Sequence, residues 1–120
     1  MHDDKEIRDI QEKIQDCIKS MRKLAPLVGK ARQVKEFSSD QRKNALASEQ
    51  MKYISRGESV AGAEVMARAN PAYLERMKAL EKDYAESCGV IAEWEATFAR
   101  YEAARSIHAM LKETMRTLEG

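Results

Sequence analysis

Apolar residues recur every three or four positions along most of the chain, the spacing that places them on one face of a helix. The longest pattern begins at Pro71, ends at Leu118 and predicts a helix over residues 71–118. Its apolar face, which we call the C-terminal stripe, alternates intervals of four and three and is interrupted only at Ser87. We expect this stripe to be buried in a helical core or against a second copy. It consists of Tyr73, Met77, Leu80, Tyr84, Ile91, Trp94, Phe98 and Tyr101.

A second regular pattern predicts a helix over residues 1–25. Its apolar positions follow intervals of three and four, which is typical of a helix paired with one other helix. Pro26 removes a backbone hydrogen bond, and Gly29 weakens the next turn, so we expect a break or kink between Leu24 and Gly29. The apolar positions are Ile7, Ile10, Ile14, Cys17, Met21, Leu24 and Val28.

The residues between these patterns predict a basic middle segment over 26–57 and a short helix over 58–70. The polar cluster at residues 38–40 has good capping chemistry for a helix that ends at Gly57. Ser59 is placed to cap the short helix, and the Asn70-Pro71 pair separates it from the long one.

Composition supports an all-α class. The chain has 120 residues, of which 34% are charged, with Gly 5 and Pro 2, far fewer turn residues than a β-sandwich requires. We expect a single helical domain over residues 1–120, an elongated helical bundle or coiled-coil hairpin with one long C-terminal helix.

The lengths of the two stripes predict self-association. The long helix spans about 70 Å, whereas the stripe from Ile7 to Val28 covers only about 33 Å. After Tyr101 the apolar positions shift to Ala104 and Ile107, and then to Leu111, Met115 and Leu118, so the covered face is expected to turn. A homodimer is the simplest way to cover the remainder, since symmetric pairs are the commonest small assembly.

Charge is unevenly distributed, although the formal net charge is only +1. Residues 1–18 contain six acids and three bases, residues 19–56 contain ten bases and three acids, and the rest contains eight bases and eleven acids. The basic middle either neutralises the acidic helices or binds an external anion such as DNA. The candidate DNA-binding residues are Lys30, Arg32, Lys35, Arg42 and Lys43.

No catalytic or metal-binding spacing is apparent in the sequence. Histidines, cysteines and carboxylates do not occur at ligand spacing, and the segment GESVAG lacks the glycine spacing and lysine of a phosphate loop. We therefore expect a protein that is not an enzyme and has no cofactor. We expect Cys17 and Cys88 to be reduced and to behave as small apolar residues.

The aromatic residues near the end of the stripe allow two interpretations. Trp94, Phe98 and Tyr101 are of the type that stacks on unpaired bases, but their helical spacing favours a core position. Arg105 is expected to stack on Tyr101 or to pair with Glu102.

Nothing in the sequence predicts membrane insertion. The start, MHDDKEIRD, is acidic and lacks an apolar core, and no stretch approaches the roughly eighteen apolar residues of a membrane span. These features favour a cytosolic protein.

Residues 38–116 resemble a group of small helical proteins encoded by tailed phages and prophages near DNA replication and recombination genes. The similarity is carried by SSDQRKNALA, by GESVAGAEVMARANPAYLERM and by IAEWEATFARYEAARSIHAMLKETMR. The resemblance implies an accessory role in DNA metabolism, in the cytoplasm of a bacterial host, and no enzymatic activity.

Together these observations predict a phage accessory protein for DNA replication or recombination that acts through self-association and contacts with an unidentified protein. Direct, sequence-independent DNA binding by the basic middle is the main alternative. A third is inhibition of a host nuclease or defence protein by the acidic arms, which would imitate nucleic acid.

Overall fold

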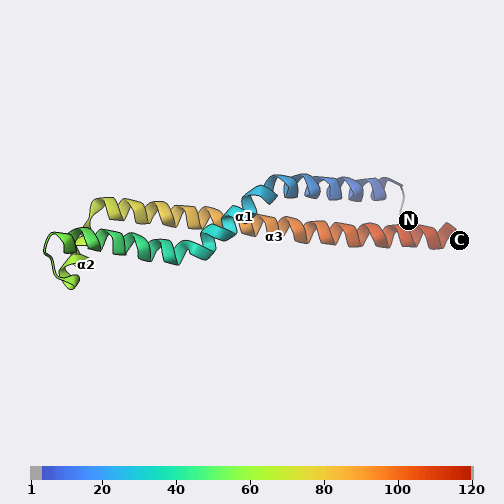
Figure 1. The fold of residues 1–120 in the computed structure, drawn as a ribbon. Helices are drawn as coiled ribbons and strands as arrows, with labels where there is room; N and C mark the ends of the chain where they lie inside the picture. Colours follow the sequence, from blue (N-terminus) through green and yellow to red (C-terminus); the bar gives the residue numbers. More distant parts are fainter. Residues whose placement is uncertain (1–3, 120) are drawn as a thin grey trace. The chain divides into compact units, whose positions relative to one another are not determined.

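The computed structural model describes residues 4–119, and 96% of these residues are helical. The helices in this range are α1 (Asp4–Ser55), α2 (Val60–Ala69) and α3 (Pro71–Glu119) (Figure 1). No strand occurs among the described residues. The all-α class and the long C-terminal helix predicted from the sequence are confirmed.

The first helix is longer than predicted. α1 passes through Pro26, Gly29 and the polar cluster at residues 38–40 as one continuous helix. Of the predicted break or kink, the break is therefore wrong, as is the helix boundary between residues 25 and 26. Val28 and Ala31, on either side of Gly29, are both buried. Their packing offsets the roughly 3 kcal/mol that an interior proline costs a helix.

The end of α1 follows the prediction. Gly57 has a φ of 100°, a left-handed conformation that glycine adopts without steric cost. The backbone N–H of Gly57 donates to the carbonyl of Ile54, and that of Glu58 donates to the carbonyl of Tyr53. This pair of bonds is a Schellman motif, which satisfies carbonyls that the helix end leaves open.

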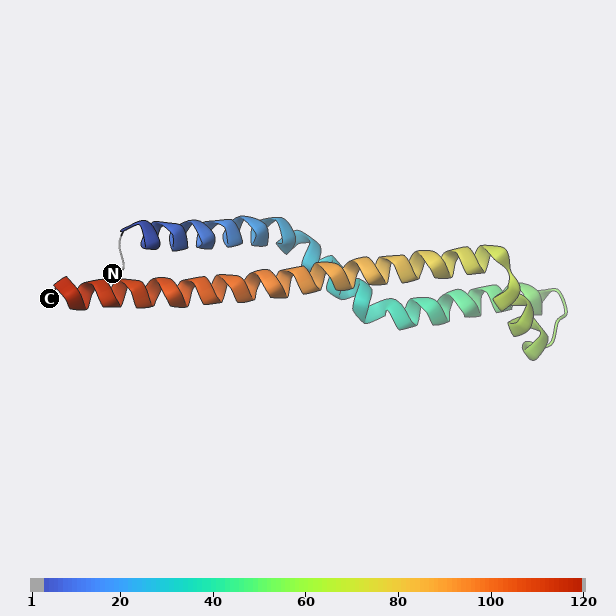
Figure 2. The same cartoon turned by 180° about the vertical axis from the view of Figure 1, so that it is seen from behind.

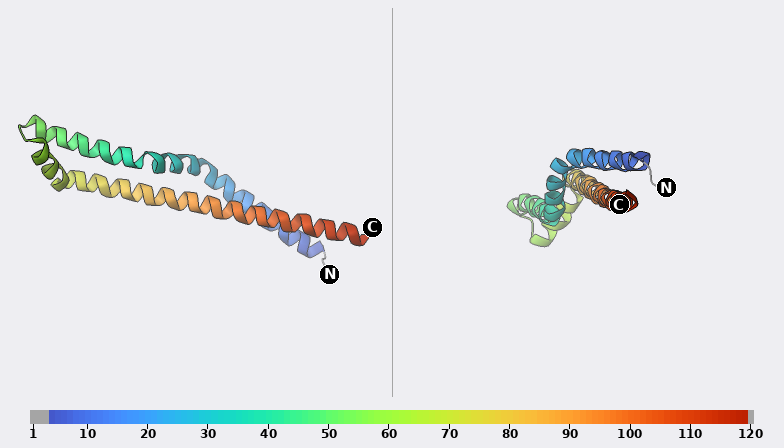
Figure 3. Two further views of the ribbon diagram at one scale, coloured as in Figure 1. Left: turned by 90° about the horizontal axis from the view of Figure 1, so that it is seen from below. Right: turned by 90° about the vertical axis from the view of Figure 1, so that its right-hand side faces the viewer.

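The short helix is also bounded as predicted. The side chain of Ser59 accepts a hydrogen bond from the N–H of Gly62 at 3.1 Å and caps α2. Asn70 is extended, as expected before a proline, and α3 begins at Pro71. α2 runs between the end of α1 and the start of α3 (Figure 3).

In place of one compact body, the described residues form two units that share both long helices. Unit 1 comprises residues 4–29 of α1 and 90–119 of α3, which run side by side in opposite directions (Figure 2). Unit 2 comprises residues 30–89 and therefore contains the rest of both long helices together with α2.

Both units have small cores. The buried residues of unit 1 are Val28, Thr97, Ala104 and Leu111, whereas unit 2 buries mainly alanines. Small residues let helix backbones approach closely, but they bury little apolar area. The larger apolar side chains are therefore left at the edges of each unit, where most are half-buried or exposed. The buried residues of unit 2 are Ala31, Ala45, Ala63, Ala67, Tyr73 and Ser87.

Candidate functional site

The C-terminal stripe faces inward over most of its length. Tyr73 is buried, and its other members are half-buried except Phe98, which is 45% exposed. Thr97, at 1% exposure, occupies the inward position instead. The inward face advances three residues from Trp94 to Thr97 and four more to Tyr101, and each residue turns the helix by about 100°. Phe98 therefore points to one flank, and its assignment to the core is wrong.

The inward face continues beyond Tyr101 without the predicted turn. It is filled by Ala104, His108, Leu111 and Met115 at intervals of four and three. Ile107 was predicted to lie on this face, but it is 40% exposed because His108 takes the inward position. The imidazole Nε2 of His108 lies 3.4 Å from the side-chain amide nitrogen of Gln11 on α1.

Arg105 makes both contacts that the sequence suggested as alternatives. Its guanidinium carbon lies 5.6 Å from the centre of the Tyr101 ring, and its Nη1 lies 3.7 Å from a carboxylate oxygen of Glu102. The Phe98 and Tyr101 rings are 6.4 Å apart, with their planes tilted by 47°. Phe98 therefore lies among aromatic and charged neighbours of its own helix.

Arg100 explains how a polar residue is tolerated on the inward face. Its Nη2 donates to the hydroxyl oxygen of Thr97 at 3.0 Å and lies 3.6 Å from a carboxylate oxygen of Glu93. The hydroxyl of Thr97 thus has a partner although the residue is buried, as buried polar groups require. The spacing of three residues was the available sequence signal for this pair.

Asn70 forms a polar junction in unit 2 that the sequence did not reveal. Its Nδ2 donates to a carboxylate oxygen of Glu49 at 3.0 Å and to the hydroxyl of Tyr53 at 2.8 Å, both on α1. Its Oδ1 accepts the N–H of Ala72 at 2.8 Å and caps α3. One side chain therefore caps one long helix and ties it to the other.

The five candidate DNA-binding residues are all exposed and lie on α1 within unit 2. Among the described residues, none of the five forms a salt bridge within 4.0 Å. The expectation that the basic middle neutralises acidic helices is not met by these side chains. Lys35 and Arg42 are seven residues apart, so they share one face of the helix.

The described part of the chain also lacks a metal-binding cluster, a disulfide and a membrane-spanning helix. No group of three or more His, Cys, Asp or Glu residues there could hold a metal ion. Cys17 and Cys88 are free cysteines. No helix between residues 4 and 119 is long and apolar enough to cross a membrane.

Comparisons of the chain with protein-family models, with curated proteins and with solved structures gave no match.

Proposed function

We propose that this chain is a non-enzymatic interaction protein that associates with itself and with other proteins through apolar helix faces. The observation that carries the proposal is the exposure of large apolar side chains on α3 in unit 1. Met110 is 60% exposed, and Ile107 lies one turn away on a neighbouring part of the same surface. Contiguous exposed apolar surface of this kind is typical of an interaction site.

The organisation of unit 1 supports the same conclusion. It contains two helical segments, whereas stable bundles generally surround a core with four. A helix in a bundle presents an apolar face broad enough for more than one neighbour. Further helices from another copy or from a partner protein would complete such a core.

The setting we propose is phage DNA replication or recombination, in the cytoplasm of the infected bacterium. This part of the proposal rests on the resemblance of residues 38–116 to phage and prophage proteins. In that setting the protein would be an accessory factor that brings other proteins together.

Two measurements test this function. Sedimentation of the purified chain at micromolar concentration should show a dimer, and a monomer at every concentration would rule out self-association. A pull-down from infected cells, with and without nuclease, should retain the same protein partner in both cases. Loss of the partner after nuclease treatment would mean that DNA bridged the two.

Direct DNA binding is the second candidate, favoured by the unpaired cations on α1. Residues 30–43 span about 20 Å of helix, enough to follow several phosphates. Because phosphate contacts release counterions, the affinity should fall with salt, with a log-log slope of about −0.9 per contacted phosphate on duplex DNA. Changing Lys30, Arg32 and Lys35 together to Gln should reduce the magnitude of that slope by about two to three.

The matched control replaces Lys78, Lys82 and Lys112 of α3 with Gln, since it removes the same number of positive charges elsewhere. This control should leave the slope almost unchanged. Both triple variants should keep the helix content of the parent protein, because exposed charged side chains contribute little to stability. Absence of binding to single- and double-stranded DNA at low salt would contradict this candidate function.

A further inference from the structure

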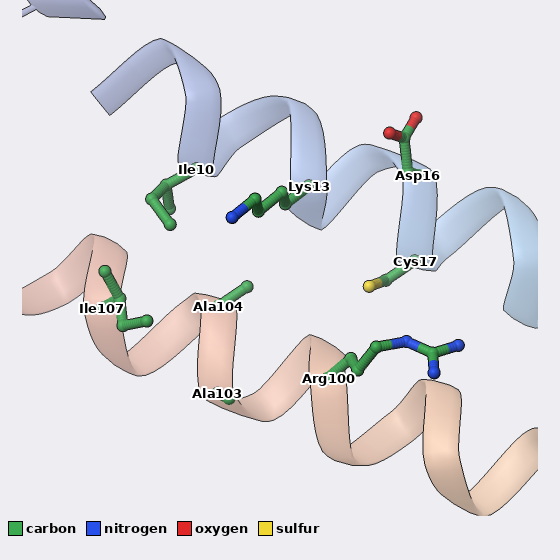
Figure 4. Close-up of a pocket in the computed structure, with 8 residues that line it drawn as sticks. All are labelled: Ile10, Lys13, Asp16, Cys17, Arg100, Ala103, Ala104 and Ile107. Atoms are coloured by element: carbon green, nitrogen blue, oxygen red, sulfur yellow. The ribbon is translucent and has the colours of Figure 1, made fainter. Parts of the chain in front are cut away.

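A groove runs along one flank of unit 1, between the first part of α1 and the last part of α3. It encloses about 470 Å³. Ile10 and Cys17 of α1 point toward Ala104 and Ile107 of α3 across it (Figure 4). The groove is thus an open apolar surface between two helices that already pair with each other.

The α3 wall of this groove belongs to a second apolar strip. Ala96, Ala103, Ile107 and Met110 follow intervals of seven, four and three, so they lie on one side of the helix. All four are exposed, and the strip runs beside the inward face that contacts α1. We call these four residues the outer strip. A helix with two adjacent apolar strips is built to contact two neighbours, and unit 1 supplies one of them.

The rim of the groove carries charges of both signs. Lys13 and Asp16 lie on the α1 side and Arg100 on the α3 side. The Asp16 carboxylate points away from α3 (Figure 4), and no salt bridge of Lys13 or Asp16 occurs within 4.0 Å among the described residues. A patch that combines an apolar centre with free charges of both signs is complementary to itself, as a two-fold interface requires.

The opposite flank of the same helix pair is different. Phe98 is exposed there, but the charged residues Glu95, Glu102 and Arg105 lie on the same side of α3 within two turns of it. Its ring already packs near Tyr101, which Arg105 covers. On α3 this flank therefore has one large exposed apolar side chain in place of a continuous strip. A smaller groove of about 290 Å³ lies on this side, where half-buried Trp94 and Tyr101 face Ile18 and Met21 of α1.

From these observations we propose that the occupant of the groove is unit 1 of a second copy of this chain. The outer strips of the two copies pack together across a two-fold axis, and the two helix pairs form a four-helix bundle. The proposal rests on the self-association in the proposed function and specifies its surface. The outer strip extends about 21 Å along the helix, so paired copies would bury its apolar side chains along four turns.

Substitutions on the two flanks test the proposal. Ile107→Glu places a charge at the centre of the outer strip and should raise the dimer dissociation constant at least about 100-fold, because a buried unpaired charge is strongly unfavourable. Phe98→Glu is the matched control, since Phe98 is on the same helix and similarly exposed. It should change the constant by less than about 5-fold. Sedimentation equilibrium of the full chain measures both values.

Met110→Glu is a second test variant, because this side chain is more exposed than Ile107, so its replacement should leave the folded monomer intact. Circular dichroism should show the parent helix content for all three variants. A dimer that resists both Ile107→Glu and Met110→Glu would overturn the assignment of this surface, as would a dimer that Phe98→Glu dissociates equally. Self-association itself would survive either result. A wild-type chain that stays monomeric would instead defeat both proposals.

Discussion

The two units use the same long helices but are stabilised in different ways. Unit 2 has a third helix, α2, whose Ala63 and Ala67 are fully buried, and the Asn70 junction ties α1 to α3. The described residues of unit 1 form only a helix pair, with the side chains of Gln11 and His108 in contact across it. The helices of unit 2 are therefore held together by α2 packing and by side-chain hydrogen bonds. Unit 1 lacks a third helix among its described residues and resembles a fragment of a larger bundle.

The exposed large apolar residues of the two units are similar in number but differ in arrangement. In unit 2 they are spread over all three helical segments, as Phe37, Met51, Val65 and Leu74 illustrate. In unit 1, Ile107 and Met110 continue the wall of one groove. Scattered apolar side chains are normal on any surface, but a continuous strip indicates an interface. This difference supports our proposal that unit 1 is the association surface, and it leads us to expect that unit 2 contributes most of the tertiary stability.

The largest effect is expected from the core of unit 1. Leu111 is 5% exposed on the inward face, so Leu111→Ala should lower the free energy of unfolding by about 3 kcal/mol. Phe98→Ala, which removes a larger but exposed side chain, should cost less than about 1 kcal/mol. Urea denaturation measures both. Equal losses would mean that Phe98 is as well packed as Leu111 and would remove the distinction between inward and outer faces.

The sequence predicted the inward face of unit 1 well up to Trp94 and less well beyond it. Up to that point, large apolar residues at helical spacing coincide with the inward positions. From there the chain places Thr97 and His108 inward and Phe98 and Ile107 outward, so the most apolar pattern and the buried face separate. Hydrophobic periodicity identifies the most apolar face, and it cannot assign that face to a partner inside or outside the chain.

The residues expected to begin or end helices were also predicted with unequal success. Gly57, Ser59 and the Asn70-Pro71 pair act through their own backbone geometry, and the structure uses each as expected. Pro26 also acts locally, but the burial of residues on both sides of Gly29 overrides it. The bonds from Asn70 to Glu49 and Tyr53 reach residues 21 and 17 positions away, respectively, which no local pattern reveals.

An intermediate effect is expected from the Asn70 junction of unit 2. Asn70→Ala removes the cap of α3 and both bonds to α1, and should cost about 2 kcal/mol. Asn70→Asp keeps an oxygen for the cap but removes the amide donor, and it places a carboxylate beside Glu49. Asn70→Asp therefore keeps the cap of α3 but loses the hydrogen bonds to α1, so comparing it with Asn70→Ala separates the contribution of the cap from that of the bonds.

Hydrogen exchange locates the effect of these variants. Both should increase exchange in unit 2, while the amides of residues 95–115 in unit 1 keep their protection, since stability is local. Equal loss of protection in both units would show that the long helices unfold as one cooperative body and would contradict the division of roles.

The smallest effect concerns the glycines at the limits of the two units. Gly29 and Gly89 lie inside α1 and α3, and a methyl group added at either would meet no atom within 4 Å. Alanine loses less conformational entropy than glycine in a helix, so Gly29→Ala and Gly89→Ala should each raise the free energy of unfolding by roughly 0.5–1 kcal/mol. The midpoint of urea denaturation should increase with an unchanged slope.

Gly57→Ala is the matched control, and its effect should have the opposite sign. Space is also available at Gly57, but its φ of 100° is a conformation that a side chain disfavours. The free energy of unfolding should fall by roughly 1 kcal/mol. A loss of stability at Gly29 or Gly89 similar to that at Gly57 would mean that the backbone at the unit limits depends on glycine. In that case Gly29 and Gly89 would be needed for a backbone conformation or flexibility that alanine does not provide.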